Sequence, residues 1–398
     1  MKRTRDFNIS EINPNTRLIV YGAGRYGELA YWGLKSLGVS IDFFMDKNRV
    51  GEELLGISII SPSKISKYSE DTILIASYNY YNEILEFLIA NKVKNIFNIS
   101  TLLELDYDVS TLSEYLRDEK CNCDKYRNVI ENESSNNLII NHCELVVTEK
   151  CTLRCKNCAN LMQYYSSPQD AEDVELEAFD RFIESIDRLL EWRILGGEPF
   201  CYSRLAELID RYASNPKILR TTIYTNSTLI PSETVLNSIK NNDVVIHMSN
   251  YGVISSKLKQ LDMVLSEKNI KHYIHDYDMW KNLGGTENRN YSEAKIASIY
   301  DNCVMATCYT FHSGKFWICP RAAHGDKLGF FREPEEEYVD YLNCADVLYN
   351  RERLRVLLTR REPIEACKFC DGFGKNTQDI KAAEQKQKGM YSIKNWFG

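Results

Sequence analysis

The sequence predicts an α/β protein with two successive series of strands and helices, followed by a cysteine-bearing C-terminal region. Three observations predict this fold. Apolar strands alternate with amphipathic stretches over residues 17–100, the same alternation begins again at residue 143, and from about residue 300 it breaks into short segments that carry cysteines. Alternation of strand and helix is typical of sheets whose strands run mostly parallel.

The composition narrows the class of protein. The chain has 398 residues, of which 44% are hydrophobic and 26% are charged, enough for two or three domains with cores of their own. The net charge of -7 provides no basic surface to attract nucleic acid, so we expect no nucleic-acid partner. No apolar stretch reaches the roughly 18 residues that a membrane span needs, and no apolar segment follows the basic N-terminal residues. We therefore expect no membrane partner and a cytoplasmic location.

The first series predicts a small α/β domain over residues 1–105. Gly22, Gly24 and Gly27 lie in the turn between its first strand and first helix, and Asp46 ends the next strand. Glycines permit a tight turn in which a phosphate can approach the helix N-terminus, and an acid at that position can accept a ribose hydroxyl. The turn predicts a nucleotide site, with a purely structural or docking role as the alternative.

The rest of the chain divides at changes in composition. Residues 106–142 are rich in Asp, Glu, Asn and Ser and predict a connector. Strand and helix alternate at least four times over residues 143–298, which predicts a parallel barrel or partial barrel. The first helix of that series is predicted from apolar residues at helical spacing: Phe179, Phe182, Ile183, Ile186 and Leu190. Residues 299–375 form a cysteine-bearing domain, and residues 376–398 are a polar tail.

The first cysteine group follows the strand LVVT directly and consists of Cys151, Cys155 and Cys158. Structural disulfides rarely persist in the cytoplasm, so grouped cysteines there indicate metal ligands or reactive thiols. Three thiolates at this spacing can hold one face of a four-iron cluster and leave one iron open for a substrate. A zinc site is the alternative, although no histidine lies between the first and third cysteine.

The spacing of these three cysteines resembles that of the radical S-adenosylmethionine (SAM) superfamily, and the resemblance covers roughly residues 143–280. The segment Leu195-Gly-Gly-Glu-Pro199 resembles the GGE motif of the family and supports the same assignment. The resemblance implies a partial (β/α)6 barrel, a [4Fe-4S] cluster on the three cysteines and SAM as a cofactor. It also implies SAM contacts at the GGE motif and at two later strand ends: Gly196, Gly197, Glu198, Thr225, Asn226, Ser249 and Asn250. Asn157 stands where the family usually has an aromatic residue near the adenine.

The second cysteine group lies in the C-terminal region and consists of Cys303, Cys319, Cys367 and Cys370. Two separated pairs of cysteines are what a four-coordinate metal site requires. The run SGKFWICP between the first two predicts a hairpin with Gly314 at its turn. The pattern resembles the twitch form of the SPASM domain, which implies one auxiliary [4Fe-4S] cluster on these four ligands. Zinc on four cysteines is the alternative that spacing leaves open.

Several residues near these motifs have no assigned role. Cys308 is a spare candidate, as a structural thiol, a substitute for Cys303 or a residue on the substrate side. The other cysteines are predicted to be free thiols, although the close pair in the connector could be more: Cys121, Cys123, Cys143, Cys201 and Cys344. Polar residues around the second group could face the substrate, but none is assigned as catalytic: Tyr309, His312, Arg321, His324 and Asp326.

The resemblances imply a reaction. A reduced cluster donates an electron to SAM, which releases methionine and a 5'-deoxyadenosyl radical that takes a hydrogen atom from the substrate. The electron is expected from a donor such as flavodoxin or ferredoxin. An auxiliary cluster with four cysteine ligands has no open iron and is suited to electron transfer, which favours net oxidation of an alcohol.

The N-terminal domain suggests the substrate. It resembles the small Rossmann-like modules attached to sugar-modifying enzymes, which implies a nucleotide-sugar or other activated sugar. Peptide leader binders usually show a small winged-helix pattern instead, so the sugar hypothesis is favoured over a peptide-modifying maturase. The motifs are also compatible with a sugar epimerase or with a non-catalytic zinc protein.

Overall fold

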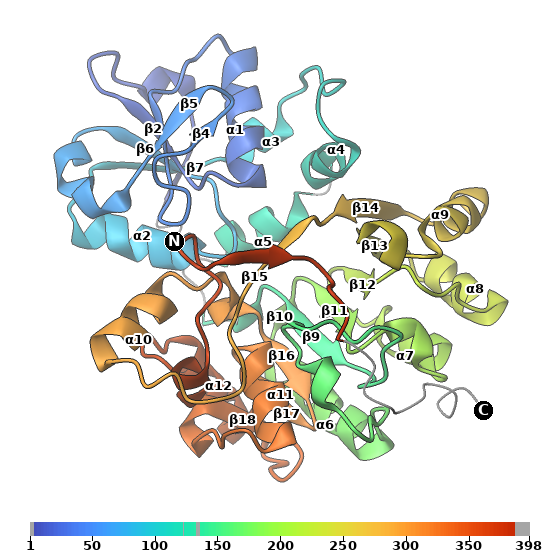
Figure 1. Ribbon diagram of the computed structural model, residues 1–398. Helices are drawn as coiled ribbons and strands as arrows, with labels where there is room; N and C mark the ends of the chain where they lie inside the picture. Colours follow the sequence, from blue (N-terminus) through green and yellow to red (C-terminus); the bar gives the residue numbers. More distant parts are fainter. Residues whose placement is uncertain (1–3, 122, 133–135, 387–398) are drawn as a thin grey trace. The chain divides into compact units, whose positions relative to one another are not determined.

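The computed structural model describes residues 4–121, 123–132 and 136–386, and the chain divides into two compact units at residues 141 and 142 (Figure 1). Each unit contains one large sheet whose strands run mostly parallel, with helices packed on it, so the predicted α/β class is confirmed. Within the described ranges, no helix has both the length and the apolar character needed to cross a membrane.

The sheet of unit 1 has the strand order β1-β7-β6-β2-β3-β5-β4, and only β4 and β5 pair antiparallel. The strands are β1 (Arg5–Asp6), β2 (Leu18–Tyr21), β3 (Phe43–Met45), β4 (Glu53–Leu54), β5 (Ile57–Ile60), β6 (Thr72–Ile75) and β7 (Asn95–Asn98). The order reverses beside β2, because the chain adds β3 and β5 on one side of β2, and then β6 and β7 on the other. A reversal of this kind leaves a crevice at the carboxyl ends of the strands.

The helices of unit 1 lie between and after these strands. They are α1 (Arg25–Ser36), α2 (Tyr81–Ala90), α3 (Ser100–Glu104), α4 (Glu114–Cys121) and α5 (Asp124–Glu131), with the 3₁₀ turns η1 (Ile9–Glu11) and η2 (Pro62–Tyr68) and a short final strand, β8 (Ile139–Ile140). All four residues of β2 and of β6 are buried, as expected for central strands that are covered on both faces.

The predicted connector differs from the structure, in which α4 and α5 belong to unit 1. Tyr126 on α5 is fully buried; its hydroxyl donates to Ile75 O and accepts from Ile99 N at 3.1 Å. Tyr126, Val129 and Ile130 are buried on one face of α5. The polar composition of residues 106–142 had concealed this short amphipathic pattern, because only one narrow stripe of α5 is apolar.

The sheet of unit 2 has the order β14-β13-β12-β11-β9-β16-β17-β18. Its strands are β9 (Cys143–Val146), β11 (Trp192–Leu195), β12 (Thr221–Thr225), β13 (Val245–Asn250), β14 (His272–Asp276), β16 (Thr310–His312), β17 (Lys315–Trp317) and β18 (Tyr338–Asp340). Strands β10 (Arg188–Leu189), β15 (Met279–Lys281) and β19 (Asp379–Lys381) lie outside this sheet. The strands from β9 to β14 and the pair β9 and β16 run parallel, whereas β16, β17 and β18 are antiparallel.

Four long helices connect the consecutive parallel strands: α6 (Asp173–Ser185), α7 (Leu205–Tyr212), α8 (Glu233–Asn241) and α9 (Leu258–Glu267). The C-terminal helices are α10 (Glu293–Asp301), α11 (Pro320–Leu328) and α12 (Val347–Leu358). Short 3₁₀ turns complete the unit: η3 (Met162–Tyr164), η4 (Pro199–Cys201), η5 (Gly252–Ile254), η6 (Val304–Thr307), η7 (Glu335–Glu337) and η8 (Glu365–Phe369). The described sheet therefore has five consecutive parallel strands with four helices, and its sixth parallel strand, β16, lies beside β9 instead of following β14.

The C-terminal region continues this sheet and belongs to the same compact unit as the preceding residues. The predicted hairpin is confirmed as β16 and β17, with Ser313 and Gly314 in left-handed conformations at its turn. The aromatic ring of Phe182 on α6 stacks on Phe316 of β17 at 5.2 Å, and the ring of Phe179 meets Phe311 of β16 edge-on at 5.1 Å. One core thus joins the first helix of the parallel series to the hairpin, which is why the hairpin is no separate domain.

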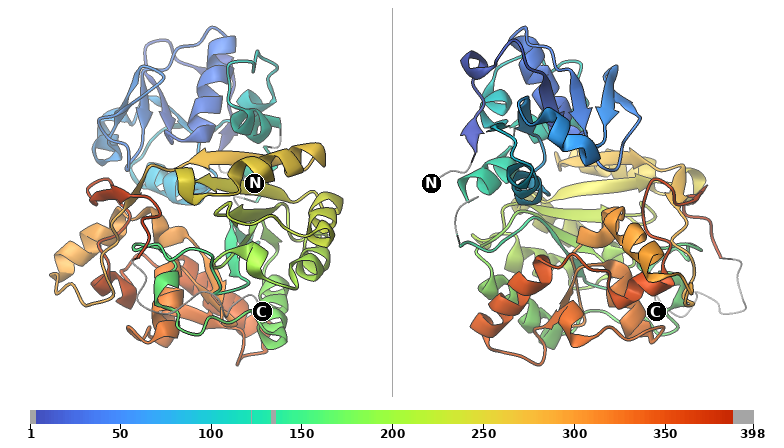
Figure 2. Two further views of the ribbon diagram at one scale, coloured as in Figure 1. Left: turned by 45° about the vertical axis from the view of Figure 1, so that its right-hand side comes forward. Right: turned by 90° about the vertical axis from the view of Figure 1, so that its left-hand side faces the viewer.

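Two further sequence predictions need correction. The helix α6 ends at Ser185, so Ile186 and Leu190 are buried beyond it and are not on its apolar face. Part of the predicted polar tail is ordered as β19, which pairs antiparallel with β15 (Figure 2). Residues 387–398 lie outside the described ranges. The error at α6 has a simple cause: apolar spacing continues past the end of a helix whenever the next buried segment has an apolar residue at the same spacing.

Candidate functional site

The three cysteines of the first group lie in the loop at the carboxyl end of β9. Cys155 is buried, and Cys151 and Cys158 are half-buried. Burial, and then the nearby thiol of Cys158, raise the pKa of Cys155 to about 12. Burial is also the main cause that raises the pKa of Cys151 and of Cys158. Crowded, buried thiols ionise when a metal supplies compensating positive charge, so this donor set fits an iron–sulfur cluster.

Backbone N–H groups are directed at two of these sulfurs. Leu153 N donates to Cys151 Sγ at 3.4 Å. For Cys158, burial raises the thiol pKa, and hydrogen bonds from the backbone of Met162 and Asn160 oppose that rise. Hydrogen bonds to the ligand sulfurs are one of the features that set the potential of iron–sulfur clusters. The loop therefore has the donors that charged cluster ligands require.

Side-chain amides provide two further donors. Asn226, which follows β12, places its Nδ2 3.6 Å from Cys151 Sγ. Gln385 donates from Nε2 to Cys155 Sγ at 3.2 Å. Asn226 was predicted to contact SAM, and the structure places it beside the cluster loop. Gln385 was not selected from the sequence, where it lies in the polar tail, and no local signal connects it with a cysteine 230 residues earlier.

The glycine pair of the GGE motif allows the end of β11 to pack tightly against the segment that leads into Cys151. A Cβ on Gly196, whose φ is +145°, would lie 2.2 Å from Thr148 O. A Cβ on Gly197 would lie 2.1 Å from Lys150 O and 2.9 Å from Cys151 Cβ. Gly197 N also donates to Thr148 O at 2.7 Å. These two residues must therefore lack side chains for the cysteine loop to keep its position.

We expect Gly197→Ala to displace the loop that begins at Cys151. Backbone atoms cannot move away as a flexible side chain would, so the substitution should destabilise the protein by about 1–3 kcal/mol. Thermal unfolding followed by circular dichroism should show a lower Tm than that of the wild-type protein. Gly285→Ala is the matched control, because a Cβ there would meet nothing within 4 Å. Equal losses in both variants would contradict the packing argument.

Glu198 connects the ends of β11 and β12. Its side chain is fully buried; Thr225 Oγ1 donates to Oε1 at 2.8 Å and Asn226 N donates to Oε2 at 2.8 Å. Phe200 N donates to Oε1 at 3.3 Å. Burial raises the pKa of Glu198 to about 7. Both carboxylate oxygens thus already accept hydrogen bonds within the protein, so Glu198 positions the strand ends; its contact with the ammonium group of SAM stays a prediction.

The end of β13 brings an aromatic residue to the cysteine loop. Asn250 Nδ2 donates to Asp276 Oδ1 at 2.6 Å, and Ser249 O accepts from Ser255 Oγ at 2.9 Å. Burial raises the pKa of the next residue, Tyr251, and the nearby thiol of Cys155 adds to the rise. Tyr251 was not predicted, although it directly follows the two selected residues. It supplies an aromatic ring near the cysteines, whereas Asn157 within the motif does not.

The four cysteines of the second group line one pocket. Cys303 precedes η6, Cys319 precedes α11, and Cys367 and Cys370 lie in and after η8. Burial is the main cause that raises the pKa of Cys319, Cys367 and Cys370. The other lining residues are mostly apolar: Ile299, Tyr300, Ala306, Ile318, Arg321, Ile364, Ala366 and Gly372. The fold thus brings together all four predicted ligands from three separate segments.

The surroundings of this pocket also suit charged sulfur ligands. Phe373 N donates to Cys303 Sγ at 3.3 Å, and Gly372 N donates to Cys370 Sγ at 3.2 Å. Cys308 is outside the described lining, and its thiol donates to Val304 O at 3.9 Å. Among the described residues, no three His, Cys, Asp or Glu side chains are grouped so as to hold a single metal ion. The four thiols thus surround a pocket rather than converge on one point.

Comparison with protein families identifies the domain that carries the first site. Residues 145–250 match the family described as the radical SAM superfamily. Residues 145–250 are a radical SAM domain. The domain begins within β9 and contains the first cysteine group, the GGE motif and the strand ends at Asn226 and Asn250, and it implies an enzyme that uses a [4Fe-4S] cluster and SAM. Residues 14–96 match a second family, described as C2185-like, N-terminal.

Similar solved structures include three that contain S-adenosylmethionine, also abbreviated AdoMet. One is anSMEcpe with bound AdoMet, at 14% identity over 55% of this chain and 82% of that chain, with a TM-score of 0.36. Another is BtrN in complex with AdoMet and 2-DOIA, at 14% identity over 63% and 98%, with a TM-score of 0.38. SuiB from Streptococcus suis, bound to S-adenosylmethionine, is 16% identical over 50% and 45%, with a TM-score of 0.29. None of the curated proteins matches the chain.

Outside the radical SAM domain, the glycines in the turn of unit 1 differ in how closely their surroundings are packed. Gly22 and Gly27 permit close packing, because a Cβ on Gly22 would lie 2.6 Å from Ala76 O and one on Gly27 would lie 2.0 Å from Gly22 O. Gly24, the N-cap of α1, is different, since a Cβ there would meet nothing within 4 Å. The turn therefore leaves open space at the N-terminus of α1.

Asp46 lies close to this turn but is already hydrogen-bonded. Its Oδ2 accepts from Ala23 N at 3.0 Å and its Oδ1 accepts from Asn48 N at 2.8 Å. The carboxylate therefore holds the glycine turn against the end of β3. The structure brings Asp46 and the glycines together as expected, and a contact with a ribose hydroxyl stays a prediction.

A pair of glutamates supports the turn that carries Cys367 and Cys370. Glu333 Oε1 accepts from Ala366 N at 2.7 Å, and Glu337 Oε2 accepts from Glu365 N at 2.7 Å. Both carboxyl groups are buried. Burial, and then the neighbouring Glu337, raise the pKa of Glu333 well above its ordinary value. Glu333 is therefore expected to be protonated at neutral pH.

We expect Glu333→Gln to become more stabilising, relative to the wild-type protein, as the pH rises. The unfolded chain loses the Glu333 proton above about pH 4.3 while the folded protein keeps it, so wild-type stability falls with rising pH through this group. Glutamine carries no such proton and keeps the oxygen that accepts from Ala366 N. Tm values measured at about pH 6 and about pH 8 test this. Glu335→Gln in the same acidic turn is the control, and a pH-independent difference between Glu333→Gln and the wild-type protein would refute the assignment.

Two histidines, one at the end of β16 and one on α11, are buried in a polar cluster. His324 Nδ1 lies 2.8 Å from Tyr165 Oη, and His312 Nε2 lies 3.2 Å from Glu149 Oε1. The two imidazole rings are 4.5 Å apart. Burial lowers the pKa of His324 well below its ordinary value, so it is neutral at pH 7. Both histidines are buried, and His312 and Glu149 also line a pocket.

Proposed function

We propose that this protein is a radical SAM oxidoreductase with an auxiliary [4Fe-4S] cluster, and that it oxidises an alcohol of a carbohydrate-type substrate. The observation that carries the proposal is the pocket lined by Cys303, Cys319, Cys367 and Cys370. A cluster with four protein thiolates has no open iron for substrate and is suited to electron transfer. An electron acceptor favours oxidation over epimerisation, because an epimerisation leaves the oxidation state of the substrate unchanged.

A buried arginine relates the two cysteine groups. Arg321 donates to Gly285 O at 2.6 Å. For both Cys158 and Cys370, burial raises the thiol pKa and the guanidinium of Arg321 opposes the rise. One cation therefore acts on a cysteine of each group. This shared cation supports the proposal that electrons pass between the two cysteine groups.

The chain's own residues prepare the SAM site. Cys151, Cys155 and Cys158 would hold the cluster, which would supply the electron for cleavage of SAM and so the radical chemistry by which a hydrogen atom is taken from the substrate. Gly197 keeps the end of β11 against the cysteine loop, and Glu198 fastens that end to β12. Cys155 and Glu198 are buried, and burial at this place would keep water from a reactive intermediate.

The substrate class follows from unit 1, which we assign as a Rossmann-like nucleotide or nucleotide-sugar domain. The strand order β5-β3-β2-β6-β7 is a doubly wound order with its reversal beside β2. The glycine turn follows β2, and Gly24 leaves open space before the N–H groups of α1. Helix N-termini of this kind bind phosphate groups.

The test combines cluster analysis with isotope transfer. The protein is reconstituted anaerobically with iron and sulfide, and then incubated with SAM, dithionite and UDP-sugars that carry deuterium on the ring carbons. We expect deuterium in 5'-deoxyadenosine together with a keto-sugar product. Deuterium transfer with an epimerised sugar would favour an epimerase, and transfer only from a peptide would favour a maturase. Bound zinc with no SAM cleavage would refute the proposal.

A further inference from the structure

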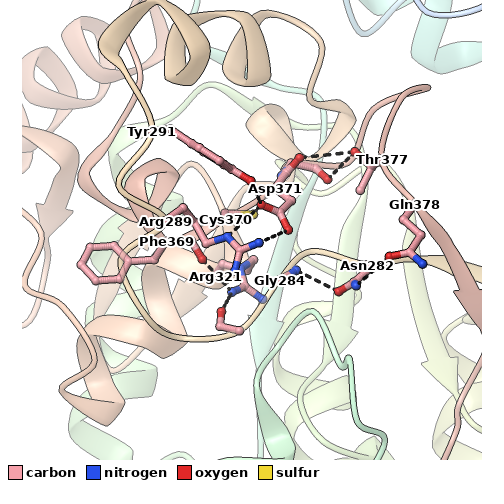
Figure 3. Close-up of polar contacts among 12 residues, drawn as sticks. Asn282, Gly284, Arg289, Tyr291, Arg321, Phe369, Cys370, Asp371, Thr377 and Gln378 are labelled. Atoms are coloured by element: carbon pink, nitrogen blue, oxygen red, sulfur yellow. Dashed lines mark hydrogen bonds and ion pairs between the residues drawn. The ribbon is translucent and has the colours of Figure 1, made fainter.

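The segment that follows Cys370 is fastened to the loop before α10. Asp371 accepts two hydrogen bonds from Arg289, at 2.9 and 2.8 Å, and one from Tyr291 Oη at 2.8 Å (Figure 3). The backbone adds to this contact, because Asp371 N donates to Leu283 O at 3.0 Å. The turn that carries Cys367 and Cys370 therefore continues into a segment whose first residue, Asp371, is hydrogen-bonded through both its side chain and its backbone.

The same segment continues as a strand. Asn282 N donates to Gln378 O at 2.8 Å, at the place where Figure 3 shows their side chains side by side. Strand β19 then pairs with β15, and Ala382 N donates to Asp278 O at 3.0 Å. Residues 379–386, here called the strap, are thus anchored at their start by regular pairing, so their far end has a defined position.

The far end of the strap lies on the first cysteine loop. Lys156 N donates to Glu384 O at 2.7 Å, and Lys386 N donates to Arg154 O at 2.8 Å. These bonds make Gln385 and Cys155 opposite members of an antiparallel bridge. The cysteine loop after β9 therefore acquires a backbone partner from the end of the described chain.

The side chain of Gln385 holds the loop by both of its polar atoms. Its Oε1 accepts from Arg154 N at 2.8 Å, and its Nε2 donates to Cys155 Sγ at 3.2 Å and to Ala383 O at 2.7 Å. Cys155 is 7% exposed, so water has little access to compete for the sulfur. A leucine or methionine would fill the same space but offer neither atom.

We propose that the strap is a structural and electrostatic support for the SAM-binding cluster, with Gln385 as the positioning residue that donates to the Cys155 thiolate. This inference rests on the proposed function, because it requires Cys155 to be a cluster ligand. An N–H donated to a ligand sulfur stabilises the reduced cluster more than the oxidised one, since the reduced cluster carries one more negative charge. Gln385 therefore raises the reduction potential of the cluster. Removing the donor lowers that potential and makes the cluster harder to reduce.

The potential is measured by redox titration monitored by electron paramagnetic resonance, and the SAM-binding cluster is recognised as the one whose signal changes when SAM is added. Gln385→Met removes the donor at similar volume, and Gln385→Glu keeps the oxygen that accepts from Arg154 N. For Gln385→Met we expect the ratio of reduced to oxidised cluster at a fixed potential to fall about tenfold, which is about 59 mV for one electron. Gln385→Glu also places a negative charge beside the sulfur, so its ratio should fall at least as far. Glu384→Gln is the matched control on the next residue, and only its exposed ion pair with Lys156 is lost.

A second measurement separates the support of the loop from the hydrogen bond to sulfur. Lys386→Pro removes the N–H that donates to Arg154 O but keeps Gln385. We expect an iron chelator to remove the SAM-binding cluster faster from this variant than from Glu384→Gln. Unchanged potentials in both Gln385 variants would overturn the role of the donor, and an unchanged release rate in Lys386→Pro would overturn the support by the strap. Absence of any SAM-sensitive signal in the wild-type protein would refute the proposed function itself.

Discussion

Cys155→Ala is expected to abolish SAM cleavage. The three cysteines at the carboxyl end of β9 are the only protein ligands that we assign to the SAM-binding cluster, so removing one leaves two of its irons without a protein ligand. The loss should exceed the roughly 100-fold effect that follows removal of a residue behind the ligands. The measurement is the amount of 5'-deoxyadenosine formed from SAM with dithionite, after anaerobic reconstitution.

Cys344→Ala is the control for this loss. Cys344 is half-buried, as are Cys151 and Cys158, but it belongs to neither group, so its alanine variant should form 5'-deoxyadenosine at the wild-type rate. Cleavage of SAM by Cys155→Ala at a rate near that of Cys344→Ala would contradict the assignment of Cys155. Equal losses in both variants, with a lowered Tm, would indicate a general effect on folding.

Cys367→Ala is expected to separate SAM cleavage from substrate oxidation. Its thiol is one of four that line the second pocket, and its removal should reduce the iron content from about eight to about four atoms per chain. SAM cleavage should continue, because the first cysteine group is intact. Oxidation of the substrate should be lost, because the electron left on the substrate radical has no acceptor. Iron counting and product analysis on one preparation measure both effects.

Cys308→Ala provides the matched control for the second pocket. Cys308 is close to Cys303 in the chain but outside the described lining, so we expect its variant to keep about eight irons. Loss of four irons in Cys308→Ala would make Cys308 a ligand in place of another cysteine. Zinc in the wild-type pocket, unchanged iron in Cys367→Ala and continued oxidation would together exclude the auxiliary cluster.

Residues that act through local geometry could be predicted from the sequence. The glycines of the GGE motif are an example, since the close approach of β11 to the cysteine loop is possible only where no Cβ intervenes. The hairpin at Ser313 and Gly314 is another, because a two-residue turn with left-handed residues follows from local chemistry. In each case the residue type and its immediate neighbours were sufficient.

Residues whose role depends on distant partners could not be predicted. The polar segment at Gln385 has no apolar periodicity. Gln385 nevertheless pairs with Cys155, because the preceding strand β19 pairs with β15 and so places the segment beside the cysteine loop. The helix α5 has a short apolar stripe within a polar segment, and its burial depends on the hydrogen bond from Tyr126 to Ile75 O at the end of β6. The position of β16 beside β9 likewise depends on the core formed by Phe179 and Phe311.

The sequence by itself determined the α/β class, the boundary at which the second series begins, and the cysteine groups with the chemistry that their spacing permits. Only the tertiary structure decided which segments share a core, which four thiols surround one pocket, and which amide donates to Cys155. The reason is physical. Spacing along the chain sets what neighbouring residues can do, whereas burial and hydrogen bonding between distant segments are settled by how the whole chain packs.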